Sequence, residues 1–241
     1  MAEKMTRREL KAPDKFTVTA GGWLEKARQH PRETLAGIGG LVVVLLVLGA
    51  LLDSGGIDVD PASGGALSQA LAIGERPVGE GEGEASFATE EERRKAFAEA
   101  LEAVRRDHPK SPAAVTATLA LADLRYAEGR HEEAIALYDA YLARTKEPHR
   151  RVLALEGKAM ALEAKGDLDA AIAAFDALAG AGAEAKGLFG KARLLERQGK
   201  WSEARAAWTT LKENHGLTYE GREAGQRLAR LNLEHPDAQE G

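Results

Sequence analysis

The chain has 241 residues, a formal net charge of −5 and no cysteine, and 29% of its residues are charged. The acidic balance argues against nucleic acid as a partner, and the lack of cysteine excludes disulfides, thiolate metal sites and a lipid-modified cysteine anchor. One uncharged block near the start contrasts with this polar background.

Residues 34–52 form that uncharged block, in which twelve of nineteen residues are Leu, Ile or Val. A helix of this length spans roughly 28 Å, close to the hydrocarbon core of a bilayer. A cleaved signal peptide is the alternative. It has a short lead, a shorter apolar core and a small-residue cleavage site, and this sequence shows none of these. The block therefore predicts one uncleaved transmembrane helix.

The flanks of this block predict its orientation. Residues 1–33 carry eight lysines and arginines, whereas the first basic residue after the block is Arg76. The positive-inside rule therefore places the basic lead, residues 1–33, in the cytoplasm and the C-terminal part across the membrane. Whether the lead forms a short amphipathic helix around Trp23 and Leu24 or stays a flexible tail is left open by the sequence.

Residues 53–84 have the composition of a linker. They contain eight glycines, two prolines and seven acidic residues against the single Arg76. Such a segment buries too little apolar surface on its own to offset the entropy of ordering it. The sequence predicts a flexible acidic tether, with at most a transient helical turn in the short apolar stretch 67–73.

The rest of the chain repeats a pattern centred on three glycines, Gly129, Gly166 and Gly199, which are 37 and 33 residues apart. A glycine in a left-handed conformation ends a helix without steric cost, and small residues where two helices cross let the backbones approach. At fixed distances from the glycines stand alanines before the turn (Ala122, Ala159, Ala192), alanines after it (Ala134, Ala171, Ala204) and aromatic residues (Tyr138, Phe175, Trp208). This period predicts a solenoid of helical hairpins.

The pattern resembles the tetratricopeptide repeat over about Ser111 to Asn214. His131, Tyr141 and the insert 179–183 depart from the usual repeat. The resemblance implies an all-α solenoid of about three repeats. The transmembrane helix predicted at residues 34–52 precedes this solenoid. We expect capping helices at Thr89–Asp107 and Tyr219–Leu233, a repeat domain over residues 85–235 and a disordered tail over residues 236–241.

The layout of lead, span and exported repeat domain is similar to a family of bacterial single-span inner-membrane proteins with periplasmic tetratricopeptide-like domains that accompany the Sec translocon. This resemblance implies a place in the bacterial inner membrane, with the repeat domain in the periplasm. It also implies a role in docking or chaperoning proteins there.

No pattern for catalysis is present in the sequence. The six histidines show no i, i+3 or i+4 pairing, and neither an HExxH motif nor a glycine-rich phosphate loop occurs. We therefore expect no enzyme, no cofactor, no metal and no small-molecule substrate. A periplasmic enzyme built on a repeat frame would need a polar pocket that the sequence does not show.

The first helix of each pair lines the concave groove in the resembled fold. The predicted partner-binding residues are accordingly Leu119, Asp123, Tyr126, Glu156, Met160, Glu163, Phe189, Arg193, Glu196 and Arg197. Apolar side chains between charges of both signs suit an extended peptide or a partner helix. A plain solvated groove, with binding elsewhere, is the competing interpretation. A self-assembling scaffold of the cell envelope is the alternative function.

Overall fold

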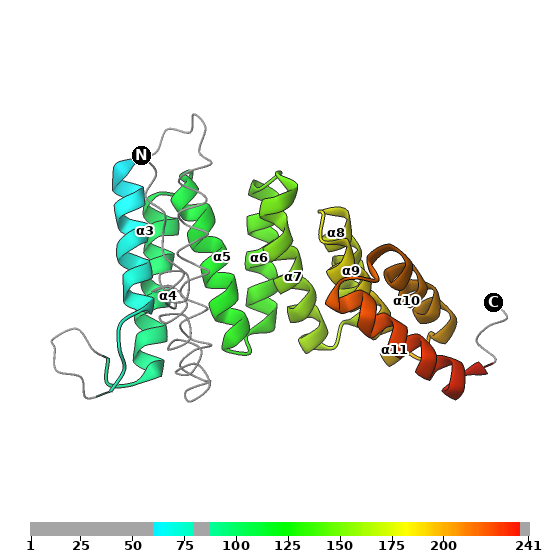
Figure 1. The fold of residues 1–241 in the computed structure, drawn as a ribbon. Coiled ribbons are helices and arrows are strands. Elements are labelled where there is room, and N and C mark those ends of the chain that lie inside the picture. Colours follow the sequence, from blue (N-terminus) through cyan, green and yellow to red (C-terminus); the bar gives the residue numbers. More distant parts are fainter. Residues whose placement is uncertain (1–59, 80–86, 237–241) are drawn as a thin grey trace, which may run out of the picture. The chain divides into compact units, whose positions relative to one another are not determined.

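The computed structural model describes residues 60–79 and 87–236, which belong to one compact unit. Within these ranges the chain forms nine helices, and each packs against the next in sequence (Figure 1). They are α3 (Pro61–Gly74), α4 (Glu90–Asp107), α5 (Pro112–Ala127), α6 (His131–Arg144), α7 (Pro148–Lys165), α8 (Leu168–Gly180), α9 (Glu184–Arg197), α10 (Trp201–His215) and α11 (Tyr219–Glu234).

The expectation of a flexible linker over residues 53–84 is wrong for Pro61–Gly74, which form α3. The carboxylate of Asp60 accepts hydrogen bonds from the backbone N–H groups of Ala62 and Ser63, and Pro61 fits the first turn. Leu67 and Ala70 are buried in one cluster with Ala98, Leu101 and Val104 of α4. The few apolar side chains of α3 are thus buried because α4 packs against them. Residues 53–59 and 80–84 of the expected linker lie outside the described residues.

This pairing also changes the count of repeats. We expected α4 to be an N-terminal capping helix, but it is the second helix of a pair whose first helix is α3. Thr89 caps α4 as predicted, because its hydroxyl accepts a hydrogen bond from the backbone N–H of Glu92 at 3.1 Å. The described residues therefore form four helical pairs, closed at the C-terminal end by α11.

The three turn glycines adopt the predicted left-handed conformation, with φ of 75° at Gly129, 91° at Gly166 and 72° at Gly199. The backbone N–H that follows each glycine bonds to a carbonyl five residues earlier, as Arg130 does to Arg125 at 2.9 Å. This geometry satisfies carbonyls that the helix end would leave unpaired. The glycine turns therefore set where the first helix of each pair ends.

The predicted core positions are confirmed. All six alanines around the turns are completely buried, and the three aromatic residues are at most 5% exposed. Two further glycines explain how the aromatic rings fit between pairs. A Cβ at Gly157 would lie 2.4 Å from the Tyr138 ring, and a Cβ at Gly190 would lie 2.4 Å from the Phe175 ring. Each ring therefore packs against a glycine backbone in the following pair, which requires the missing side chain.

The first helices of successive pairs form an inner row. Helix α3 contacts α5, α5 contacts α7, and α9 contacts α11, while side chains of α9 bond to side chains of α7. One face of this row forms the site described below.

No helix in residues 60–79 and 87–236 is long and apolar enough to cross a membrane. The predicted span at residues 34–52 lies outside these ranges, as do the basic lead and residues 237–241 of the predicted tail.

Candidate functional site

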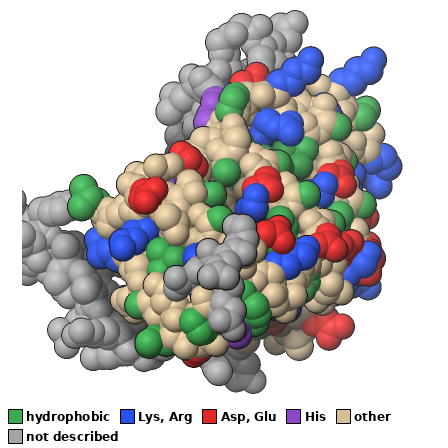
Figure 2. Space-filling model, turned by 90° about the vertical axis from the view of Figure 1, so that its right-hand side faces the viewer, with side chains coloured by type: hydrophobic (Ala, Val, Ile, Leu, Met, Phe, Trp, Pro, Cys, Tyr) green, Lys and Arg blue, Asp and Glu red, His purple; other side chains and the backbone are tan. Residues whose placement is uncertain are grey.

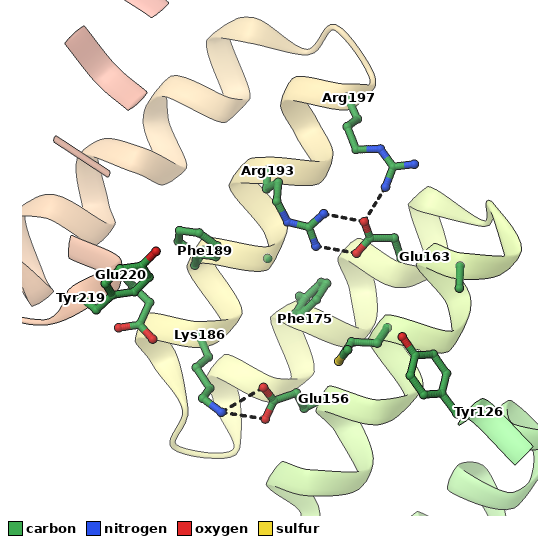
Figure 3. A pocket seen from close by; sticks show the side chains of 13 residues that line it. Tyr126, Glu156, Glu163, Phe175, Lys186, Phe189, Arg193, Arg197, Tyr219 and Glu220 are labelled. Carbon is green, nitrogen blue, oxygen red and sulfur yellow. Dashed lines mark hydrogen bonds and ion pairs between the residues drawn. The ribbon is translucent and has the colours of Figure 1, made fainter. Parts of the chain in front are cut away.

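The inner row carries an open pocket of about 650 Å³, here called the groove pocket. Its walls come from α5, α7, α9 and the first turn of α11, with one ring from α8 at its base (Figure 3). The lining residues are Tyr126, Glu156, Met160, Glu163, Ala164, Phe175, Lys186, Phe189, Gly190, Arg193, Arg197, Tyr219 and Glu220.

One end of the groove pocket holds an ionic cluster that joins two repeats. Both guanidinium Nη atoms of Arg193 on α9 donate to the two carboxylate oxygens of Glu163 on α7, each at 2.5 Å. Arg197 donates from Nη1 to one of the same oxygens. These arginines hold the pKa of Glu163 below its usual range, with the Arg193 hydrogen bonds as the largest cause, and the same bonds raise the pKa of Arg193. The cluster therefore stays ionised at neutral pH, with two positive charges against one negative.

A second ion pair crosses the same two helices. Lys186 near the start of α9 donates to both carboxylate oxygens of Glu156 on α7, at 2.9 Å each. Figure 3 shows Phe175 and Phe189 between this pair and the arginine cluster. The two ionic groups thus flank an apolar strip.

The apolar strip consists of Tyr126, Met160, Phe189 and Tyr219. It is partly open to solvent, which is unusual for side chains of this size. Met160 is 41% exposed and Tyr219 is 67% exposed, while Tyr126 and Phe189 are half-buried. Phe175 at the pocket base is only 5% exposed, and its ring packs against the backbone of Gly190. Exposed apolar surface in a concave site, framed by charges, suits reversible binding of a polypeptide.

Seven of the ten predicted groove residues line this pocket: Tyr126, Glu156, Met160, Glu163, Phe189, Arg193 and Arg197. The other three have structural roles. Leu119 is buried in a core cluster with Ala134 and Tyr138. The prediction that Leu119 is a groove contact is therefore wrong, because the neighbouring helices enclose its side chain.

Asp123 accepts a hydrogen bond from the Tyr138 hydroxyl at 2.7 Å and does not line the pocket. The residue Asp123 as a whole is exposed, but surrounding protein atoms partly shield its carboxylate from water. This desolvation raises the pKa of Asp123, and the hydrogen bond from Tyr138 offsets part of the rise. The residue therefore anchors a core aromatic ring of α6 to α5.

Glu196 accepts a hydrogen bond from the indole N–H of Trp208 at 2.6 Å and pairs with Arg227 and Arg230 of α11. A fully buried indole N–H needs an acceptor, and Glu196 on the preceding helix supplies it. The predicted groove role of Glu196 is wrong for this reason, since the carboxylate is used inside the fold.

Sequence reasoning missed six lining residues: Ala164, Phe175, Lys186, Gly190, Tyr219 and Glu220. A signal existed for one of them, because Gly157 and Gly190 both stand nine residues before a turn glycine. The others depend on which chain segments meet across the inner row, as with Lys186 and Glu156, which are thirty residues apart.

On the face drawn in Figure 2, basic and acidic side chains are interleaved with small hydrophobic spots. Among residues 60–79 and 87–236 no group of three His, Asp or Glu side chains could hold a metal ion. The chemistry visible in the groove pocket is thus hydrogen bonding, ion pairing and apolar contact.

Glycine-turned helical pairs that stack to form an inner groove define a helical-repeat binding scaffold. Comparison with protein families identifies two stretches, residues 92–148 and residues 186–217, as tetratricopeptide repeat. The chain thus carries tetratricopeptide repeats, which are interaction modules that typically lack catalysis and whose partners are proteins. Comparison with curated proteins and with solved structures found no significant match.

Proposed function

We propose that this chain is a membrane-anchored interaction protein whose groove pocket binds a polypeptide partner at the periplasmic face of a bacterial inner membrane. The observation that carries the binding role is the exposed apolar strip between two ionic groups on the inner row. The membrane anchor rests on the uncharged block at residues 34–52 and on the basic residues that precede it.

The apolar strip supplies affinity and the ionic groups supply orientation in this proposal. Burying the exposed part of Met160 and Tyr219 under a partner would remove apolar surface from water. The Glu156–Lys186 and Glu163–Arg193 pairs already hold α7 and α9 together, so the groove is formed before the partner arrives. A partner among the components of the Sec translocon or of envelope biogenesis agrees with the layout of the chain.

Photo-crosslinking tests the binding role. A photoreactive phenylalanine analogue replaces Met160 in the groove pocket, and a matched control carries it at Ala173, which is exposed on α8 and does not line the pocket. After irradiation in the native host, we expect a discrete protein adduct from the Met160 position and none from the Ala173 position. Equal adducts from both positions would contradict groove binding.

Protease treatment of spheroplasts tests the anchor. We expect added protease to degrade the repeat domain, and the membrane fraction to retain the protein in alkaline carbonate. A protected repeat domain, or release by carbonate, would refute the proposed topology. Mass measurement in mild detergent would reveal self-assembly, the alternative function.

A further inference from the structure

The apolar strip of the groove pocket runs obliquely across four helices. Tyr126 on α5 stands three residues before its turn glycine, Met160 on α7 stands six before, and Phe189 on α9 stands ten before. Tyr219 in the first turn of α11 continues the series. Each step moves back by about one helical turn, so the strip is a continuous inclined path.

One side of this path carries unused hydrogen-bond donors. Arg197 is 48% exposed and donates only from Nη1, to Glu163, among the interactions of the described residues. The edge of the guanidinium formed by Nε and Nη2 therefore has no protein partner in the part of the chain that the structure describes. This edge presents two parallel N–H groups, the geometry that binds a carboxylate through both oxygens.

The local charge agrees with such a ligand. The two arginines exceed Glu163 by one positive charge, whereas the Glu156–Lys186 pair is balanced. The remaining charge, Glu220, lies beside Tyr219 at the α11 side of the pocket, away from Arg197 (Figure 3). The excess positive charge is therefore local to the arginine side of the strip.

From this geometry we infer that the groove pocket selects polypeptide segments in which an acidic side chain lies next to large apolar side chains. The apolar side chains occupy the strip between Met160 and Phe189, and the carboxylate binds the open edge of Arg197. Glu163 has a positioning role, since its carboxylate holds both guanidinium groups. The inference rests on the proposed function, because it concerns the same pocket.

The test uses three short fluorescein-labelled peptides and the full-length chain in mild detergent. The peptides share two phenylalanines and differ only in the residue between them, which is glutamate, glutamine or lysine. Fluorescence anisotropy gives the dissociation constant of each. We expect the glutamate peptide to bind about fivefold more tightly than the glutamine peptide, as for a partly exposed charge pair worth about 1 kcal/mol, and the lysine peptide to bind most weakly.

Substitutions then assign this preference to one side chain. Arg197→Gln is expected to abolish the preference for glutamate, and Arg197→Lys, which keeps the charge without the fork, to restore only part of it. Arg94→Gln is the matched control, because Arg94 is also a half-exposed arginine with one carboxylate partner, Glu90, but lies on α4 outside the groove pocket. This control is expected to keep the full preference.

Equal binding of the glutamate and glutamine peptides would overturn the inference and leave groove binding intact. Loss of the preference in Arg94→Gln as strongly as in Arg197→Gln would also overturn it, since the effect would then be one of net charge. Binding of none of the peptides would overturn the selectivity. The crosslinking at Met160 would in that case decide separately whether the proposed function stands.

Discussion

The N-terminal pair α3–α4 and the three pairs that follow bury their apolar faces by different means. In the later pairs a left-handed glycine makes a tight turn, and a large aromatic residue fills the space to the next helices. In the first pair the helices are joined by residues 75–89, and Leu67 and Ala70 pack on Leu101 and Val104. No buried aromatic residue belongs to that cluster.

This difference bears on how the solenoid unfolds. In a stack of helical pairs each pair contacts only its neighbours, so stability is a sum of local and neighbouring terms. The aromatic rings Tyr138, Phe175 and Trp208 of the later pairs are buried, whereas Phe97, the aromatic residue beside the α3–α4 cluster, is only partly buried. We therefore expect the N-terminal pair to open more readily than the pairs near α10, and four predictions test this comparison.

The largest effect is expected from Trp208→Ala. Trp208 is completely buried and contacts Phe189 edge-on, with ring centroids 5.3 Å apart. Its removal leaves a large cavity and takes away the indole N–H that donates to Glu196, so the free energy of unfolding should fall by about 3–5 kcal/mol. Urea denaturation followed by circular dichroism measures the loss. Hydrogen exchange should accelerate in α9–α11 and stay unchanged in α3 and α4; equal acceleration everywhere would show one cooperative unit.

The reciprocal change is Leu101→Ala in α4. Leu101 is fully buried between α3 and the next pair, so its truncation should cost about 2–4 kcal/mol. Hydrogen exchange detected by mass spectrometry should rise in α3, in α4 and in the part of α5 that packs against Leu101, and stay unchanged in α10. Faster exchange in α10 after this substitution would refute the independence of the N-terminal pair.

A smaller effect is expected at the glycine that receives an aromatic ring. In Gly190→Ala the new methyl group would clash with Phe175, a cost of about 1–3 kcal/mol that the better helix propensity of alanine offsets in part. We expect a net loss of about 1–2 kcal/mol by thermal or urea unfolding. Gly225→Ala in α11 is the control: no atom lies within 4 Å of its new Cβ, so the substitution should stabilise the chain slightly.

The smallest effect is expected from Glu163→Gln, and it depends on pH. The pKa of Glu163 is lower in the folded state than in the unfolded state. Ionised Glu163 therefore stabilises the fold fully above its ordinary pKa of about 4.3. This stabilisation is lost as the pH falls through the lower pKa of the folded state. We expect the variant to lose about 1 kcal/mol at neutral pH and the difference from the parent protein to shrink below about pH 4. Unfolding curves across this range measure it. A difference that is constant with pH would contradict the ionic role.

Much of the repeat fold followed from local patterns. The turn glycines, the six alanines and the three aromatic residues recur at fixed spacings, and helix geometry converts such spacings directly into faces and contacts. The resemblance to the tetratricopeptide repeat, in which the first helix of each pair lines the groove, led to seven of the groove-pocket residues.

Contacts between distant segments could not be read in this way. Helix α3 packs against α4, from which a connecting segment of fifteen residues separates it. The composition of residues 53–84 alone does not show this contact, and the prediction of a flexible linker was therefore wrong for α3. Similarly, Asp123 and Glu196 were expected to face the groove. Each carboxylate instead accepts a hydrogen bond from an aromatic side chain of the next helix, Tyr138 or Trp208. Which helix lies opposite a given position determines whether a side chain binds inside the fold or faces a partner.

The sequence by itself thus determined the class of fold, the places where helices turn and the residues that separate them, because these depend on backbone conformation and side-chain size within one pair. The tertiary structure decided the number of pairs and the membership of the groove pocket. It also decided which charges are paired, because these depend on surfaces that meet only after the pairs have stacked.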